Sequence, residues 1–452
     1  MSTNRYELTP EQLALAEARK LKKLEREKEQ VKNARQNDPR GRILERRWLR
    51  LQSSAEGAQS VKVMTWNMLA QTLVRRELFP ESDCLKASQR EHMLYTEILS
   101  HRADICCLQE VDRTEKVFPV LGEAGYSFVF KAGPRKKHGS VIAFSKDKFE
   151  LVEDRQVFYD ETDVRQDGDE RGRKGSSFFT KNIANLVALR RRDSDEGFFV
   201  GTTHLFWHPR YTYERARQIG ILFREITRFR EELAKPSWPC LVAGDFNFQP
   251  DDAAYALLVG DPLLPAQRAA LQFSRVVHRS RDPSVPAPAP KADADEDGED
   301  GSEGDPDRVI TNARAAVPSD GLLSDDELAA LFAWGTRPVS AYDAGLRTAD
   351  RGVRDTLAFG SRVPLPEGRR GACEPAWTSY THYWKTVLDY IFVLDPPDRQ
   401  VSVLGLAEPF PEEKLVPGLP RKGVCGSDHI SLSAELAWDA PTHAEPRSTC
   451  DP

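Results

Sequence analysis

The sequence predicts a layered α/β domain with at least eight strands, and three observations indicate this fold class. Eight short apolar segments of strand length follow one another between residues 61 and 436. Amphipathic segments of helical length separate several of them. Hydrophobic residues make up 40% of the chain, which is enough for a sizeable core. No internal repeat is visible at a fixed period.

The strands are expected, in chain order, at residues 61–66, 103–110, 140–144, 182–189, 198–204, 240–246, 387–393 and 430–436. Helices are predicted at Gln89–Ser100, Tyr213–Leu233 and Ser324–Trp334, with Ser324 and Glu327 as a capping box for the last one. Cys106 and Cys107 are adjacent within a strand, so their side chains should point to opposite faces. Because the seven cysteines are an odd number without a C-x-x-C motif, no disulfide framework is expected.

The first 60 residues differ in composition from the rest and are predicted to form a charged, partly helical arm. Thr9 and Pro10 suit the start of a helix that would run to about Lys32. Its apolar stripe is thin, so it is either a solvated tail or a docking arm for RNA or a ribonucleoprotein. The basic run 40–50, which includes Trp48, suits either use.

The formal net charge of −6 has a local origin. Residues 292–307 hold nine acidic residues and no basic one, and without them the chain would carry +3. This block follows a proline-rich run, so residues of about 281–308 are predicted to be a disordered insert. Residues 438–452 are expected to be a C-terminal tail. Because no secretory signal and no membrane-spanning run are visible, we expect an intracellular protein, in the cytoplasm or the nucleus.

Several predicted strands end in a side chain that can bind a metal or move a proton. A lone carboxylate after a strand is usually a turn former, but a whole series of such residues is hard to explain in this way. The residues are Asn67, Glu110, His204, Asp245, Asn247, Asp389, Asp428 and His429.

This set of residues suits the hydrolysis of a phosphate ester. Mg²⁺ takes one or two carboxylates as ligands and keeps its other positions for water and phosphate, so Glu110 is predicted to be the principal metal ligand. Asp245 would orient the attacking water, while Asn67 and Asn247 align phosphate oxygens. His204 and His429, the latter oriented by Asp389, would stabilise the charge that develops on the phosphorus oxygens.

Six ordered motifs resemble those of the endonuclease/exonuclease/phosphatase superfamily over about residues 61–437. They are M-T-W-N-M-L-A-Q, C-L-Q-E-V, T-H-L, G-D-F-N, L-D-Y-I-F and S-D-H-I. The resemblance implies a four-layered sandwich of two β-sheets flanked by helices, and Mg²⁺-dependent cleavage of phosphoesters. The flanking residues are similar to the deadenylase-like branch, above all to the fungal Ngl-type RNA exonucleases. The P-x-W-C-D-R signature of the inositol 5-phosphatase branch is absent, since residues 375–380 read P-A-W-T-S-Y.

The resemblance also assigns roles to individual residues. It implies that Asn67 and Glu110 hold the metal and phosphate, and that Asp428 is a second metal or water ligand. The chain departs from the repressor-type deadenylases at His138–Ser140 and at Tyr213–Arg215, which puts strict poly(A) preference in question. Substrate-binding residues are predicted for single-stranded RNA, whose bases stack on aromatic rings. They are Trp207, Pro209, Arg215, Tyr383 and Trp384.

The sequence therefore predicts a Mg²⁺-dependent 3′–5′ RNA exonuclease that releases nucleoside 5′-monophosphates, with Mn²⁺ as a substitute ion. Its expected partners are the 3′ ends of single-stranded RNA, and ribonucleoprotein or pre-ribosomal particles through the N-terminal arm. Two alternatives stay open: a phosphatase or phosphodiesterase acting on a small phosphorylated molecule, and an inactive ribonucleoprotein adaptor. The natural RNA, the number of metal ions and the oligomeric state are left open.

Overall fold

The computed structural model describes residues 38–52, 59–286, 310 and 312–438. The predicted N-terminal helix, the acidic block 292–307 and the predicted tail after Trp438 lie outside these residues. Within the described ranges, no helix is both long and apolar enough to cross a lipid bilayer.

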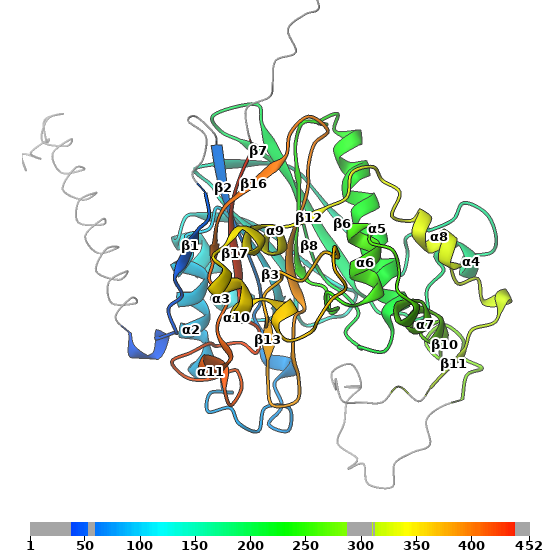
Figure 1. Cartoon of the computed structure of the whole chain (residues 1–452), viewed down its shortest axis with the longest axis horizontal. Coiled ribbons are helices and arrows are strands. Elements are labelled where there is room, and N and C mark those ends of the chain that lie inside the picture. Colours follow the sequence, from blue (N-terminus) through cyan, green and yellow to red (C-terminus); the bar gives the residue numbers. More distant parts are fainter. Residues whose placement is uncertain (1–37, 53–58, 287–309, 311, 439–452) are drawn as a thin grey trace, which may run out of the picture.

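Two mixed β-sheets pack face to face at the centre of the molecule (Figure 1). The first sheet contains, in spatial order, β1 (Trp48–Arg50), β16 (Val401–Ala407), β17 (Leu432–Trp438), β2 (Gln59–Asn67), β3 (Ile105–Val111), β5 (Gly139–Ser145) and β4 (Tyr126–Ala132). The second contains β12 (Val339–Ser340), β15 (Asp389–Leu394), β9 (Cys240–Asp245), β8 (Gly197–His204), β7 (Ile183–Arg191) and β6 (Phe149–Phe158). Two hairpins stand apart: β10 (Val276–His278) with β11 (Ala313–Ala315), and β13 (Ser379–Tyr380) with β14 (Lys385–Thr386).

The core between the sheets is made by alternate residues of each strand. Val63, Ile105 and Cys107 face it from the first sheet, and Val200 and Leu241 from the second. Cys106 belongs instead to the cluster on the outer face of the first sheet, which confirms that the two cysteines point in opposite directions. All six cysteines in the described part of the chain are free thiols.

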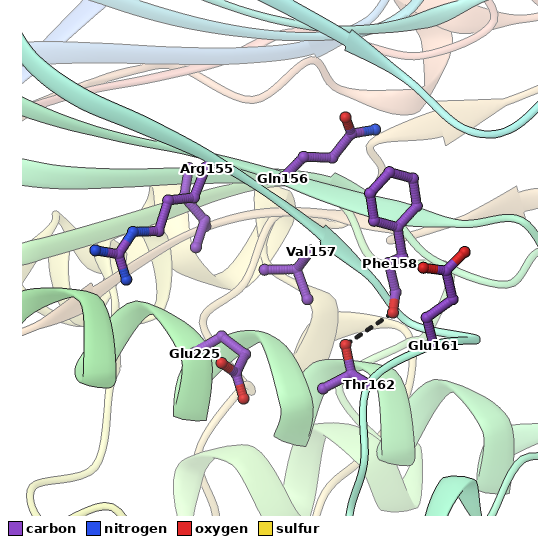
Figure 2. A pocket seen from close by; sticks show the side chains of 8 residues that line it. Arg155, Gln156, Val157, Phe158, Glu161, Thr162 and Glu225 are labelled. Carbon is purple, nitrogen blue, oxygen red and sulfur yellow. Dashed lines mark hydrogen bonds between the residues drawn. The ribbon is translucent and has the colours of Figure 1, made fainter. Parts of the chain in front are cut away.

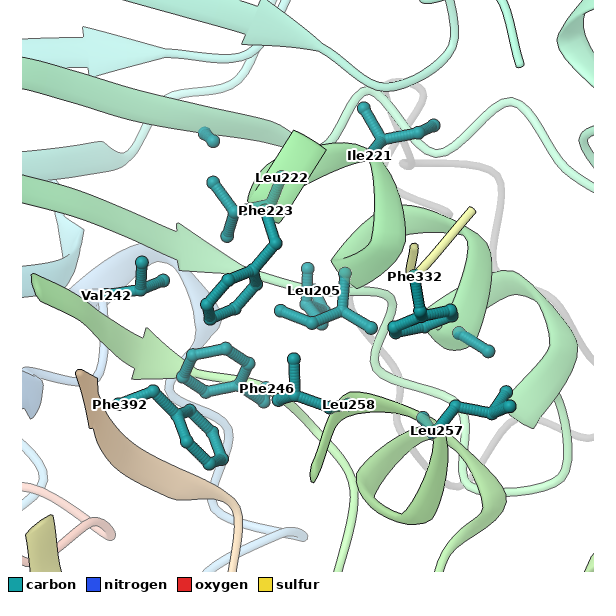
Figure 3. Close-up of a cluster of buried hydrophobic side chains, with 14 of the residues drawn as sticks. Leu205, Ile221, Leu222, Phe223, Val242, Phe246, Leu257, Leu258, Phe332 and Phe392 are labelled. Atoms are coloured by element: carbon teal, nitrogen blue, oxygen red, sulfur yellow. The ribbon is translucent and has the colours of Figure 1, made fainter. Parts of the chain in front are cut away.

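Helices cover both outer faces of the sheets. The first sheet is covered by α2 (Ala87–Ser100) and α3 (Thr114–Glu123), and the second by α5 (Thr212–Glu232), α6 (Ala253–Val259) and α7 (Pro265–Phe273). Figure 3 shows the second interface, in which Phe223 from α5 packs near Phe246 and Phe392. The remaining short helices are α4 (Glu170–Lys174), α8 (Asp325–Ala330), α9 (Ala341–Thr348), α10 (Arg351–Leu357) and α11 (Glu412–Leu415). The four-layered sandwich is confirmed.

All eight predicted strands are present as β2, β3, β5, β7, β8, β9, β15 and β17. The structure adds β4, β6 and β16, which the sequence analysis missed. β6 reads F-E-L-V-E-D-R-Q-V-F and lies at a sheet edge with most side chains partly exposed, so it lacks an apolar signal. The predicted helix at Ser324 ends at Ala330 rather than Trp334, but its capping box of Ser324 and Glu327 is confirmed.

The described part of the predicted N-terminal arm belongs to the folded domain, so the boundary expected at residue 60 is wrong for residues 38–52. β1 pairs with β16 at the edge of the first sheet. The Arg46 guanidinium is buried and forms an ion pair of 2.7 Å with Glu97 on α2. The predicted insert also starts later than residue 281, because Asp282 forms an ion pair of 2.8 Å with Arg314 and Val285 is buried.

Candidate active site

The predicted site residues meet at one edge of the two sheets. β2 and β3 are parallel neighbours in the first sheet, as are β8 and β9 in the second, so their carboxyl ends lie at the same edge. β15 runs antiparallel to β9, and its first residue, Asp389, lies opposite Asp245. The β2 and β3 strands also contact β9 and β8 across the sandwich. Residues far apart in the sequence therefore gather at a single place.

Asn67 connects the two sheets through its side-chain amide. Its Nδ2 donates to Glu110 Oε1 at 3.1 Å and to Asp245 Oδ2 at 2.9 Å. All three side chains are buried. The Asn67 Oδ1 accepts a hydrogen bond from the Leu69 amide at 3.0 Å, which fixes the orientation of the amide group.

Both histidines contact the same carboxylate. His204 lies between two acids, with Nδ1 3.6 Å from Glu110 Oε1 and Nε2 3.6 Å from Asp245 Oδ2. His429 Nε2 lies 3.7 Å from the same Asp245 oxygen, while its Nδ1 lies 2.8 Å from Asp389 Oδ2. Asp389 thus orients the ring, and Asp245 is the centre of the cluster.

Two site residues have a backbone conformation that costs free energy. Glu110 has φ 55° and Asn247 has φ 53°, in the left-handed region that residues other than glycine rarely adopt. Such residues cost about 1–3 kcal/mol each and need support from their surroundings. Glu110 Oε2 accepts a hydrogen bond from the backbone amide of Ala70 at 2.8 Å. The backbone amide of Asn247 donates to Asp245 Oδ1 at 3.1 Å. Glu110 also lies where the pairing of β3 with β5 shifts register.

Asp428 approaches the site from the loop before β17. Ser427 Oγ donates to the Asn67 carbonyl oxygen at 2.7 Å, which ties this loop to the end of β2. Burial raises the pKa of the Asp428 carboxyl, and the negative charge of Glu110 adds to this effect while His429 and Arg90 oppose it.

The electrostatic balance keeps Glu110 ionised. Burial opposes its charge, but His204, His138, the Ala70 amide and Asn67 together hold the pKa of Glu110 below its ordinary value. Burial likewise opposes a charged His429, yet the carboxylates of Asp389, Asp428 and Asp245 raise the pKa of His429 well above its usual value. The site thus favours the ionised form of Glu110 and the protonated form of His429.

The donor atoms of this site fit a divalent cation. Glu110 and Asp428 are both buried, and the negative charge of Glu110 contributes to the raised pKa of Asp428, so a bound cation would favour the ionised form of both groups. Carboxylate and amide oxygens are the ligands that Mg²⁺ prefers. A second group, in which ligand atoms of Asp245, Asp389 and His429 lie within 4.8 Å of one another, also has the composition of a metal site.

The predicted substrate-binding residues lie on surface loops, with one exception. Pro209 and Tyr383 are exposed, and Trp207 and Trp384 are half-buried on the loops after β8 and between β13 and β14. Arg215 is different: its side chain is 1% exposed and binds the Pro209 carbonyl and Asp252 at 2.9 and 3.0 Å. Arg215 therefore supports the loop of Pro209 from inside the protein and presents no accessible charge to a substrate.

Two residues near the site were not among the predicted site residues. His138 lies close enough to Glu110 and His204 to influence the pKa of Glu110. Arg90 of α2 is buried and donates to the carbonyls of Met68 and Leu69, each at 2.6 Å, and to that of Gly426 at 2.6 Å. The sequence offered a signal for His138, which stands out from the related deadenylases, but none for a buried arginine on an amphipathic helix.

A pocket of about 270 Å³ lies elsewhere, between β6 and α5 (Figure 2). Arg155, Glu161 and Glu225 line it, together with Leu186. Arg155 is already bound to Glu153 and Glu232, and no predicted site residue reaches this pocket. It is separate from the candidate active site.

The site and the double-sheet fold define a hydrolase of phosphate esters. The model of the Endonuclease/Exonuclease/phosphatase family matches residues 64–429. This range includes every residue of the candidate active site. The chain belongs to this family. It is 31% identical over 408 residues to the probable RNA exonuclease C9B6.11c of Schizosaccharomyces pombe, covering 84% of this chain and 76% of that one. It is 27% identical to the RNA exonuclease NGL2 of Saccharomyces cerevisiae, covering 83% and 78%.

Solved structures agree on the fold. The structure of ANGEL2, a 2′,3′-cyclic phosphatase, superposes with a TM-score of 0.57 at 18% identity and covers 88% of this chain and all of that one. The family and the likeness to fungal Ngl-type enzymes are confirmed.

Proposed function

We propose that this protein is a Mg²⁺-dependent 3′–5′ RNA exonuclease that releases nucleoside 5′-monophosphates. The observation that carries this proposal is the joining of Glu110, Asn67, Asp245 and the two histidines at one edge of the sandwich. The names of the related fungal RNA exonucleases support RNA as the substrate.

Glu110 is the proposed principal metal ligand, with Asp428 as a second ligand or as a partner of bound water. When bound, Mg²⁺ supplies positive charge that stabilises the phosphate oxygens during attack. Asn67 keeps Glu110 and Asp245 at a fixed separation, because both hydrogens of its side-chain amide are donated to these two carboxylates.

Asp245 accepts the proton of the attacking water, and Asn247 positions that water beside it. His204 and the His429 imidazolium donate hydrogen bonds to the phosphorus oxygens as negative charge develops there. Asp389 holds His429 in the required orientation through the contact at Nδ1. Tyr383 and Trp384, between β13 and β14, provide aromatic faces for a base, and Trp207 and Pro209 on the loop after β8 provide a further contact.

The test is the substitution Glu110→Gln, assayed on a 5′-labelled single-stranded RNA with Mg²⁺. We expect loss of degradation by at least about 100-fold, because the charge that binds the cation is removed while the shape is kept. The melting temperature without added metal should fall slightly, because the groups that hold the pKa of Glu110 below its ordinary value favour its charged form in the folded state.

Glu150→Gln is the matched control, because Glu150 lies on β6 in an exposed ion pair with Arg190. Wild-type activity is expected for this variant. Nearly full activity of Glu110→Gln would contradict the proposal. A wild-type enzyme that ignores RNA but cleaves a small phosphomonoester would favour a phosphatase of the same fold instead.

A further inference from the structure

An exposed aromatic ring stands on a firmly anchored loop between α4 and β7. Phe179 is 48% exposed, although its neighbour Phe178 is buried in a cluster with Phe206 and Tyr211. The Phe179 amide donates to Ser280 Oγ at 3.0 Å, and the Thr180 amide donates to Asp160 at 2.9 Å. The backbone on both sides of the ring is therefore fixed, and the ring is held at the surface.

The same loop reaches the catalytic edge of the second sheet. Asn182 Nδ2 donates to the carbonyl oxygen of His204 at 2.5 Å. Phe179 precedes Asn182 by three residues, so even a fully extended chain places its Cα within about 11 Å of that of Asn182. The loop that carries the exposed ring therefore contacts the end of β8, where His204 of the proposed active site is located.

An arginine lies over the ring of Phe179. The Arg281 guanidinium carbon is 4.4 Å from the ring centroid, a distance typical of a cation–π contact. Among the residues that the structure describes, no carboxylate forms an ion pair with Arg281. Arg281 and Ser280 follow β10, so the hairpin that borders residues 287–309 also contributes to this surface.

We infer that Phe179 and Arg281 form a second nucleobase-binding surface, the Phe179–Arg281 shelf, on which a base of the RNA substrate stacks. Aromatic rings and guanidinium planes both accept stacked bases, and the positive charge suits the phosphate backbone. Arg281 approaches one part of the ring, and the 48% exposure leaves the remaining surface open to a base.

The shelf binds a base on the 5′ side of the cleaved bond. This inference rests on the proposed RNA exonuclease function, in which a single nucleotide lies on the 3′ side of that bond. The shelf and the aromatic pair of Tyr383 and Trp384 lie on different loops, and we assign them to different bases of the RNA. At most one of these two surfaces can bind the 3′-terminal nucleotide. Because the shelf contributes no residue to the cluster around Asp245, we assign it to a base further from the 3′ end.

The experiment compares wild type and Phe179→Ala on a ladder of single-stranded oligoribonucleotides, from the dinucleotide to chains long enough to reach the shelf. We expect the KM of Phe179→Ala for long RNA to rise about 5- to 150-fold, the range for loss of one stacked base. The kcat and the kcat/KM for the dinucleotide should stay at wild-type values. Phe179→Trp, which keeps an aromatic ring at this position, should have the wild-type KM for long RNA.

Val152→Ala is the matched control, because Val152 is a 49% exposed apolar residue of β6, near the end of the sheet away from His204. Its KM for every oligonucleotide should equal that of wild type. An unchanged KM of Phe179→Ala for long RNA, or an equal loss on the dinucleotide, would overturn the shelf. A wild-type enzyme that degrades none of the RNAs would instead overturn the proposed function, so the two failures are distinguishable.

Discussion

At the scale of single residues, Asp245 organises the site. One of its oxygens accepts from Asn67 and lies within 3.7 Å of both histidines, while the other accepts from the Asn247 amide. A buried carboxylate with so many partners is held in one orientation. The His429 ring, which Asp389 holds in place, supplies the positive charge that faces it.

Asp389→Asn tests that charge. The change keeps the size of the side chain but removes the carboxylate that, after the opposing effect of burial, does most to raise the pKa of His429. The imidazolium will then lose its proton at a lower pH. We expect the alkaline limb of the pH profile of kcat/KM for RNA to move to lower pH, and kcat at neutral pH to fall about 100- to 10,000-fold.

The profile of Asp395→Asn provides the comparison, because Asp395 is partly buried after β15 and accepts a hydrogen bond from Trp438 rather than from a histidine. Its alkaline limb should match that of wild type. An unchanged limb in Asp389→Asn would show that the charge of the His429 imidazolium does not limit activity at high pH.

At the scale of secondary-structure elements, α2 joins two loops that carry site residues. Arg90 on this helix donates to the backbone after β2, which carries Asn67, and to Gly426, which precedes Asp428 by two residues. A single planar guanidinium makes these bonds in different directions. Arg90 is therefore a positioning residue for the proposed metal ligands.

Arg90→Lys keeps the charge but removes the fork of donors. We expect the Mg²⁺ concentration for half-maximal activity to rise about 10- to 100-fold, as for lost support of metal ligands. At saturating Mg²⁺, the activity of Arg90→Lys should return to nearly the wild-type value. A titration with Mg²⁺ at a fixed RNA concentration measures both the half-maximal concentration and the maximal activity. Recovery with added Mg²⁺ separates positioning from general instability.

Arg224→Lys is the control, since Arg224 of α5 also donates to a carbonyl, that of Asp163, but far from the metal ligands. Its Mg²⁺ requirement should equal that of wild type. A normal Mg²⁺ requirement in Arg90→Lys would contradict the positioning role.

At the scale of the whole molecule, the distribution of charge matters for a polyanionic substrate. The net charge of −6 depends on the nine acidic residues of 292–307, without which the protein would carry +3. The described residues on either side of this block belong to the hairpin of β10 and β11, which also supplies Arg281 of the shelf. The block therefore joins the domain near the surface where RNA is proposed to bind.

Replacing the nine acidic residues by Asn and Gln changes charge at constant length. We expect the KM for RNA to fall a few-fold at low salt, because repulsion of the phosphate backbone is removed, and to converge with wild type at high salt. A salt series of KM values provides the measurement. Equal KM values at low salt would show that the block has no electrostatic effect on binding.

The sequence by itself determined eight strands of the two sheets and most of the polar residues that meet at their shared edge. Apolar runs such as those of β3 and β9 are visible because both faces of these strands are buried, so no polar residue interrupts the pattern. The polar residue that ends each run then stands out. Edge strands such as β6 escaped the analysis because partly exposed strands tolerate charge.

Only the tertiary structure decided which residues act together. Hydrogen bonds across the sandwich, such as that from Asn67 to Asp245, join residues 178 positions apart, and no local pattern encodes them. Burial also changed two predictions, since Arg215 supports a loop from inside and residues 38–52 join the domain. The Phe179–Arg281 shelf has the same origin: local sequence governs periodicity and turns, whereas proximity depends on how the two sheets pack.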